Sequence, residues 1–382
     1  MKKLQRLTRW WSKPPPEFPI WTLPLEILFI IAESLPLEDV ARLTQTSHFF
    51  AHALEPYLYA HAATHLLARK PRMILDWAAE KDRLSVLEKI RTYGKHTGDR
   101  LTVIPLKCKT RALSLAAKQG HTAAAELLLN MGAEINQAVP IEDSYHFTAL
   151  HRAARRGHIG TATFLLDNGA DLNIHGTPSE SAVLEYAARW GQTEMVLLLL
   201  SRGADIKTPS LLANAVFSEN IDLVRTLLNR GGEINGSWHC RLSAIHWAMP
   251  YSKPNIPMLK LLLERGIDPD IGDFDRDNTA LHWAAGEGDV EVVKLLLEHG
   301  ADVNIADNLG HRPLHCVAER TDGGGRERQK ERVLQMLLDA GADVLATDDE
   351  GNSALDFAES AGWPEMTNLL VIAANGVEGN GA

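Results

Sequence analysis

One short pattern recurs through most of this 382-residue chain, and it limits the possible folds more than any other feature. It reads TALHRAARRGH at 148–158, SAIHWA at 243–248 and TALHWAAGEGD at 279–289. An aliphatic stretch and a glycine follow each copy, as in FLLDNGADLN at 164–173. Because self-similarity of this kind is the signature of repeat architectures, the chain is predicted to fold as an array of one small unit.

The spacing of the copies indicates a unit of about 33 residues. The leucine-type position recurs at steps of between 28 and 41 residues. These positions are Leu75, Leu113, Leu150, Leu184, Leu212, Ile245, Leu281, Leu314 and Leu355. In six units, 15 residues separate the second small residue of the motif from the following glycine, as from Ala154 to Gly169. A constant distance fits a rigid helix-turn-helix that ends in a left-handed glycine.

Each position of the motif suits a pair of antiparallel helices. The opening Thr or Ser can cap the first helix, paired alanines let helices approach closely, and the leucines fill the layer between units. In these residues the chain resembles the ankyrin-repeat family over residues 72–373, in about nine units. The resemblance implies an all-α solenoid with hairpin fingers. Solenoids need atypical end units, and the first and last units have Asp76 and Asp356 in the histidine place.

The repeat pattern varies at several places. Residues 95–110 lengthen the first finger, 319–332 add residues between two helices, and the finger between Gly203 and Leu212 is short. PYSKPNIP at 250–257 is predicted to shorten the second helix of its unit, because proline is poorly tolerated inside helices. Residues 374–382 are predicted to form a disordered tail.

Residues 18–60 precede the repeats and are predicted to form three short helices. Apolar residues recur there at helical spacing, Pro24 suits a first helical turn, and Pro36 ends the first helix. About forty residues rarely hold a core alone without a disulfide, a metal or a partner. Residues 1–17 are predicted to be a flexible basic and proline-rich N-terminus, and 61–71 a helical linker.

The pattern within this module resembles an F-box. The resemblance implies docking to a Skp-type adaptor and, through the adaptor, to a cullin. The residues that it implies for adaptor binding are Leu23, Pro24, Glu26, Ile27, Leu28, Ile31, Leu35, Val40 and Leu43. The alternative is an ordinary helical cap for the solenoid.

Charge and composition indicate which class of partner the chain binds and in which cellular compartment it is found. The formal net charge of -10 gives no global support for binding nucleic acid or an anionic membrane, so a protein partner is expected. No apolar run approaches the ~20 residues that span a bilayer, and the N-terminus lacks the apolar stretch of a secretory signal. Three isolated cysteines fit neither a disulfide framework nor a zinc site. A cytoplasmic or nuclear location is therefore predicted.

Several segments resemble metal-binding or phosphate-binding motifs, but each lacks residues that the motif requires. DFDRDN at 273–278 resembles the start of a calcium loop, but Asn278 replaces the turn glycine and Ala284 stands where a bidentate Glu is required. Glycines 323–325 have no lysine to complete a phosphate loop. The motif histidines are His151, His246, His282 and His315. In ankyrin repeats this histidine forms hydrogen bonds across the fold, so we predict no enzyme activity, no cofactor and no metal.

Two functions fit these observations: the target-binding subunit of a Skp/cullin/F-box ubiquitin ligase, or a scaffold or adaptor that uses the repeats alone. The family implies that the target binds a concave face, with contacts from Lys118, Arg152, Arg155, Arg156, Tyr186, Arg189, Trp190, Phe217 and Tyr251. Residues 118–190 of this face are basic and aromatic, whereas 265–310 hold eleven acidic and three basic residues. An acidic or phosphorylated target segment is expected in the basic half. Trp247 and Trp283 also occupy variable positions of this face, and for them packing within the motif is favoured over contact with the target.

Overall fold

The computed structural model describes residues 71–96, 104–140, 147–175, 182–237, 242–249, 253–319 and 326–379. The module at 18–60 and every adaptor-binding residue named above lie outside these ranges, as does Tyr251. The described residues form helices joined by turns, without a β-strand. Isolated β-bridges, Ser237 with Ser243 and Thr347 with Ser353, occur in two of the fingers. The all-α solenoid predicted from the repeats is confirmed.

The chain divides into two compact units, residues 1–142 and 143–382. The described helices of the first are α6 (Pro71–Glu80), α7 (Leu84–His96), α8 (Leu106–Gln119) and α9 (Thr122–Asn130). They form two pairs, with α6 packed on α8 and α7 packed on α9. Asp76 accepts a hydrogen bond of 2.8 Å from Arg111 Nε, which links the two pairs.

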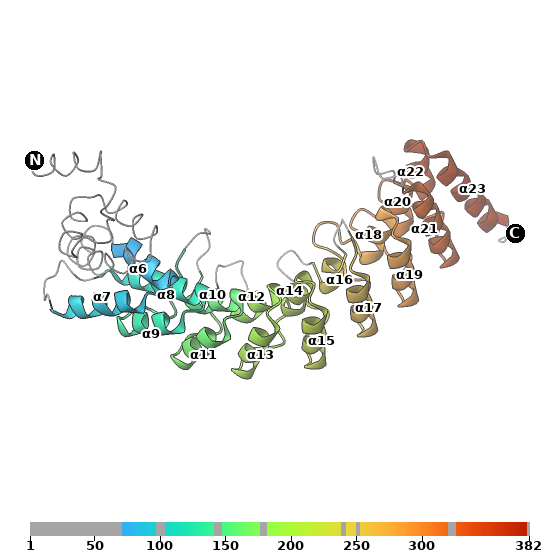
Figure 1. The fold of residues 1–382 in the computed structure, drawn as a ribbon. Coiled ribbons are helices and arrows are strands. Elements are labelled where there is room, and N and C mark those ends of the chain that lie inside the picture. Colours follow the sequence, from blue (N-terminus) through green and yellow to red (C-terminus); the bar gives the residue numbers. More distant parts are fainter. Residues whose placement is uncertain are drawn as a thin grey trace, which may run out of the picture. The chain divides into compact units, whose positions relative to one another are not determined.

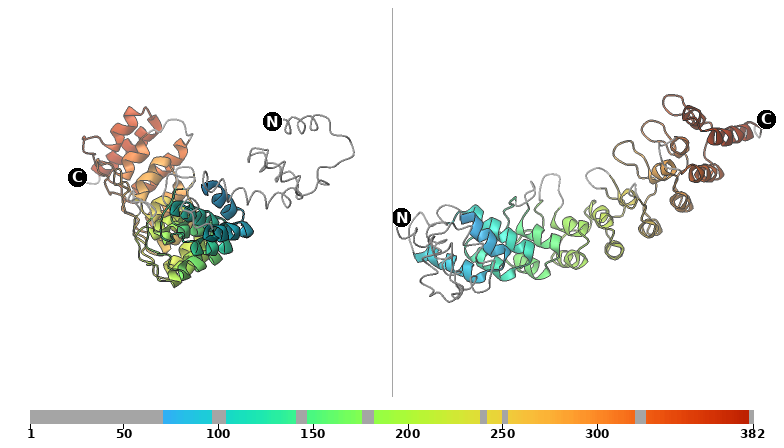
Figure 2. Two further views of the ribbon diagram at one scale, coloured as in Figure 1. Left: turned by 90° about the vertical axis from the view of Figure 1, so that its left-hand side faces the viewer. Right: turned by 45° about the horizontal axis from the view of Figure 1, so that its top comes forward.

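The described part of the second unit contains seven further helix pairs. Their first helices form one row and their second helices another (Figures 1 and 2). The first helices are α10 (Ala149–Arg156), α12 (Val183–Arg189), α14 (Leu211–Phe217), α16 (Ala244–Trp247), α18 (Ala280–Glu287), α20 (Pro313–Ala318) and α22 (Ala354–Ser360). The second helices are α11 (Ile159–Asp167), α13 (Thr193–Ser201), α15 (Ile221–Asn229), α17 (Ile256–Glu264), α19 (Val290–Glu298), α21 (Glu327–Asp339) and α23 (Pro364–Gly379). Each pair is one repeat, and α6/α7 is the first.

The core repeats from pair to pair. In the third repeat Leu150, Ala153 and Ala154 of α10 and Leu165 of α11 are buried, and α10 packs on both α11 and α12. Small alanine side chains permit this close packing of helices. Because each repeat buries its apolar face against its neighbours, its stability depends on them.

Left-handed glycines follow the second helices, as the sequence predicted. The φ angle is 88° at Gly169 and 86° at Gly300, a region that costs other residues roughly 1–2 kcal/mol. The first repeat differs, because α7 continues through Gly94 to His96. The 15-residue spacing, counted from Ala79, predicts that Gly94 ends this helix, and that prediction is wrong. A glycine inside a helix costs only about 1 kcal/mol relative to alanine, so it does not force an end.

Two other predicted helix ends also need correction. The second helix of the sixth repeat, α17, keeps nine residues, and the first helix, α16, is short with four. Pro257 lies in the first turn of α17, where its missing N–H costs nothing, and Asn255 caps that turn. In the last repeat, α23 runs to Gly379, so residues 374–379 are helical instead of forming a disordered tail. No proline interrupts the helix there.

Two of the motif histidines, His246 and His282, join successive repeats, as predicted. His282 Nδ1 accepts the backbone N–H of Thr279 at 3.1 Å, so the ring proton is on Nε2, which lies 3.0 Å from the His311 carbonyl of the next finger. His246 Nε2 lies 3.1 Å from the Asn278 carbonyl in the same way. Burial lowers the pKa of both imidazoles, which keeps them neutral near pH 7.

Glu185 replaces the histidine in the fourth repeat. One carboxylate oxygen accepts the backbone N–H of Ala182 at 2.9 Å, and the other accepts the hydroxyl of Ser210 from the fifth repeat. A carboxylate can only accept, so the link to the next repeat runs in the opposite direction from that of a histidine. A carboxylate that accepts hydrogen bonds therefore joins the fourth and fifth repeats, where other repeats use an imidazole that donates one.

Candidate protein-binding surface

Three motif positions, where the structure describes them, lie on one face of the row of first helices in the second unit. They are the residue after the motif histidine and the residues three and four places further on, which share a helix face. We call this surface the first-helix face. Its residues include Arg152, Arg155, Arg156, Tyr186, Arg189, Trp190, Phe217, Trp247, Trp283, Gly286, Glu287, Cys316 and Glu319.

Arginine and aromatic side chains stack across successive repeats on this face. The guanidinium carbon of Arg155 lies 4.2 Å from the ring centre of Trp190, and that of Arg189 lies 4.6 Å from the ring centre of Phe217. Phe217 in turn meets Trp247 edge to face at 5.0 Å. We call these five residues the arginine–aromatic ladder. It continues from the third repeat to the sixth.

The ladder exposes the residue types that dominate protein interfaces. Trp190 is 45% exposed and Phe217 41%. Arginine and large aromatic residues are enriched among interface hot spots. Stacking uses the flat face of a guanidinium, and carboxylate or phosphate binding uses its N–H edge. Arg155 and Arg189 can therefore keep their aromatic contacts while binding an anionic group.

The predicted contact residues fall into distinct groups. Arg155, Tyr186, Arg189, Trp190 and Phe217 are brought together in or beside the ladder, since the rings of Tyr186 and Trp190 lie 6.5 Å apart.

The remaining predicted contacts lie elsewhere. Arg156 is exposed at the end of α10, whereas Arg152 is only 5% exposed and lies 5.7 Å from the Phe147 ring. Arg152 therefore offers little surface to a partner. Lys118 is half-buried in α8 of the first unit.

Trp247 joins the ladder, although packing within the motif was the favoured prediction for it. It occupies the position after the motif histidine, as Arg152 and Tyr186 do. The alignment of repeats therefore places it on the same face. Its contact with Phe217 depends on how the fifth and sixth repeats pack.

Metal binding and membrane insertion each require a particular arrangement of residues. Within the ranges that the structure describes, no group of three or more His, Cys, Asp or Glu residues could hold a metal ion. Among the helices described, none has both the length and the apolar character that crossing a membrane requires.

Comparison with known proteins supports the repeat assignment. The family profile described as "Ankyrin repeats (3 copies)" matches residues 75–176, 184–273, 212–307 and 245–348. Ankyrin repeat and SOCS box protein 16 of Homo sapiens is 30% identical over 197 residues, 50% of this chain and 43% of the human protein. The match thus spans less than half of that relative.

A bacterial relative and a solved structure are also similar. The ankyrin repeat protein YahD of Escherichia coli (strain K12) is 27% identical over 194 residues, 49% of this chain and 93% of that protein. The crystal structure of the human ASB11 ankyrin repeat domain has 26% sequence identity and a TM-score of 0.47. That match covers 60% of this chain and 98% of the human domain.

Proposed function

Because the chain belongs to the ankyrin-repeat family, we propose that it binds a target protein on its first-helix face as the substrate-recognition subunit of a Skp/cullin/F-box ubiquitin ligase. The observation that carries the target site is the arginine–aromatic ladder. It places two arginines beside exposed aromatic rings over four adjacent repeats. Partner proteins would transfer the ubiquitin, and this chain would hold the target.

The chemistry of the ladder favours an acidic or phosphorylated target segment. Arginine binds carboxylate and phosphate groups through two parallel N–H bonds, and such charge-assisted bonds are about twice as strong as neutral ones. Trp190 and Phe217 add apolar contact area next to the guanidiniums. A target segment that combines acidic and apolar residues would use both parts of this surface.

The ligase part of the proposal rests on the sequence of residues 18–60, which resembles an F-box. The human relative gives a parallel, since its name combines ankyrin repeats with a second element, the SOCS box. An adaptor-docking module joined to a target-binding solenoid is a layout that would bring a target to a ligase.

The alternative is a scaffold or adaptor that uses the repeats without a ligase. The Escherichia coli relative favours it, because the match spans 93% of that protein and leaves little room for another module. In that case the N-terminal helices would only cap the solenoid.

Co-purification of the full chain with a Skp-type adaptor separates the two functions. We expect the native chain to retain the adaptor and the Leu28→Asp and Ile31→Asp variants to lose it. Leu309→Asp is the matched control, because Leu309 is 44% exposed in the repeats. Retention of the adaptor by the two N-terminal variants would remove the ligase proposal, as would failure of the native chain to bind it.

The target site is tested by reversing charge. The full chain carrying Arg155→Glu and Arg189→Glu should bind an octaglutamate peptide several-fold more weakly than the native chain. The control carries Arg225→Glu and Arg230→Glu, which change the same charge at exposed positions in and just after α15. Equal binding by the two double variants, with folding intact, would place the anionic site elsewhere.

A further inference from the structure

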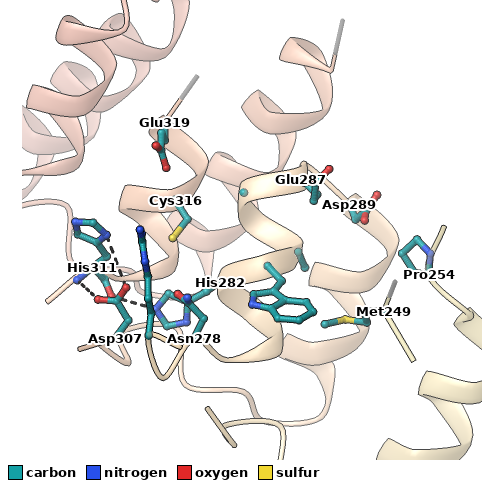
Figure 3. Close-up of a pocket in the computed structure, with 14 residues that line it drawn as sticks. Met249, Pro254, Asn278, His282, Glu287, Asp289, Asp307, His311, Cys316 and Glu319 are labelled. Carbon is teal, nitrogen blue, oxygen red and sulfur yellow. Dashed lines mark hydrogen bonds and ion pairs between the residues drawn. The ribbon is translucent and has the colours of Figure 1, made fainter. Parts of the chain in front are cut away.

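A hollow of about 230 Å³ lies on the first-helix face at the seventh and eighth repeats. Trp283 and Gly286 line it from α18, and Cys316 lines it from α20. Glu287 and Asp289 lie on one side, with Cys316 and Glu319 on another (Figure 3). Small-molecule sites usually measure ~300–1,000 Å³, so the hollow is sized for a single side chain.

The hollow exists because Gly286 has no side chain. The corresponding position carries Arg155, Arg189 and Phe217 in the third, fourth and fifth repeats, and there it forms the ladder. A Cβ on Gly286 would lie 3.9 Å from Cys316 Cβ, in ordinary contact, so a side chain there would fill the space. Gly286 is inside α18, where glycine costs roughly 0.5–1 kcal/mol relative to alanine. The backbone conformation at Gly286 is helical and would accept a residue with a side chain. The hollow, in contrast, stays open only if position 286 has no side chain.

One wall of the hollow is an aromatic ring held in a fixed orientation. Trp283 Nε1 donates a hydrogen bond of 3.0 Å to Asp273 Oδ2. Its ring also meets the His246 ring edge to face at 5.1 Å. The face of a tryptophan ring is the strongest aromatic site for a cation, at up to about 6 Å.

The charge around the hollow is negative. Its lining holds four carboxylates and one guanidinium, which belong to Glu287, Asp289, Asp307, Glu319 and Arg276. Burial and the nearby Asp307 and Glu319 raise the pKa of the Cys316 thiol to about 12, which is the response of an acid to a desolvated, negative surrounding.

Two further cations reduce this charge without removing it. Arg326 lies 3.2 Å from a Glu287 oxygen and 3.8 Å from an Asp289 oxygen. Lys330 Nζ donates to the Glu319 backbone carbonyl at 2.7 Å. Burial and the neighbouring Glu287 still raise the pKa of Asp289 against the opposing effect of Arg326. The lining therefore favours a positive ligand group.

We propose that this hollow binds an arginine or lysine side chain of the target, between the Trp283 ring and the carboxylates. The proposal extends the proposed target site, because hollow and ladder occupy the same repeat positions of one unit. The target segment is then bipolar, with an acidic part on the arginine–aromatic ladder and a basic residue at Trp283.

The separation of the two parts follows from the repeat stacking. Arg189 on α12 and Trp283 on α18 are three repeats apart. Packed helices lie ~8–10 Å from each other, which gives roughly 24–30 Å. An extended chain covers about 3.3 Å per residue. About eight residues should therefore separate the acidic part of the target from its basic residue.

Labelled peptides test this proposal by fluorescence anisotropy with the full chain. The first has four glutamates, an eight-residue Gly-Ser spacer and an arginine, and the second has glutamine in place of the arginine. We expect the arginine peptide to bind roughly five-fold tighter, about 1 kcal/mol. Gly286→Leu, which fills the hollow, should remove this preference and leave the affinity for the glutamine peptide unchanged. Gly376→Leu is the control at another helical glycine with no neighbour within 4 Å.

The outcomes separate the hollow from the ladder. Equal binding of the two peptides to the native chain would overturn the proposal, as would a preference for arginine that survives Gly286→Leu. Loss of binding by both peptides in the Arg155→Glu and Arg189→Glu chain supports the ladder, and the Gly286→Leu chain then tests the hollow by itself. If the arginine preference persists in the charge-reversed chain while the glutamine peptide is unaffected by the reversal, the hollow stands and the ladder does not.

Discussion

Replacing His282 by alanine measures how strongly one histidine holds two repeats together. The ring is 1% exposed and bonds the Thr279 N–H on one side and the His311 carbonyl on the other. His282→Ala leaves both backbone groups without these bonds, at about 1–3 kcal/mol for each buried group. Relaxation and water entry reduce the sum, so we expect a loss of roughly 2–4 kcal/mol in unfolding free energy.

Urea unfolding and hydrogen exchange of the full chain measure this loss. Stability in a solenoid is nearest-neighbour, so exchange should accelerate first in α18 and α20. His299→Ala is the control, because that ring bonds only the Leu295 carbonyl of its own helix, at 2.8 Å. We expect about 1 kcal/mol or less for the control. Equal losses in the two variants would show that the motif histidine does not join repeats.

The cost of His282→Ala is predicted to depend on pH. Burial lowers the pKa of His282 from 6.5, so below that pH the unfolded chain binds a proton that the native chain does not. The contribution of His282 is therefore full above pH 6.5. It declines as the pH falls toward the lowered native value, by at most about 1.4 kcal/mol per pH unit. The cost of His282→Ala should be smaller at pH 5.5 than at pH 7.5, and a constant cost would contradict the assigned neutral state.

Three further predictions concern other parts of the chain. Gly169→Val and Gly300→Val should each destabilise the fold by about 1 kcal/mol or more, because φ is 88° and 86° while nothing lies within 4 Å of an added Cβ; unchanged thermal melting would contradict this. Cys316, with its pKa near 12, should react with Ellman's reagent at pH 8 far more slowly in the native chain than in urea, and equal rates would show that the thiol is accessible and ionisable. A fragment of residues 1–59 should show weak helical circular dichroism without a Skp-type adaptor, whereas a cooperative melt of the isolated fragment would show a self-sufficient fold.

Much of the fold could be predicted from the sequence because the motif acts locally. The distance from Ala154 to Gly169 is that of a rigid helix-turn-helix, and the left-handed glycine caps were expected from it. The resemblance to ankyrin repeats also indicated which face carries Arg155, Arg189 and Trp190. These features depend on helix periodicity and on backbone conformation, which a single repeat already specifies.

Other features depend on how neighbouring repeats meet. The prolines near 254 suggested a shortened α17, but packing and an Asn255 cap preserve that helix, and α16 is the short one. Arg152 and Arg155 look alike in the motif, yet one is buried near Phe147 and the other stacks on Trp190 of the next repeat. The tertiary structure decides these outcomes because the space around a side chain is bounded by residues from adjacent repeats. The hollow at Gly286 arises for the same reason.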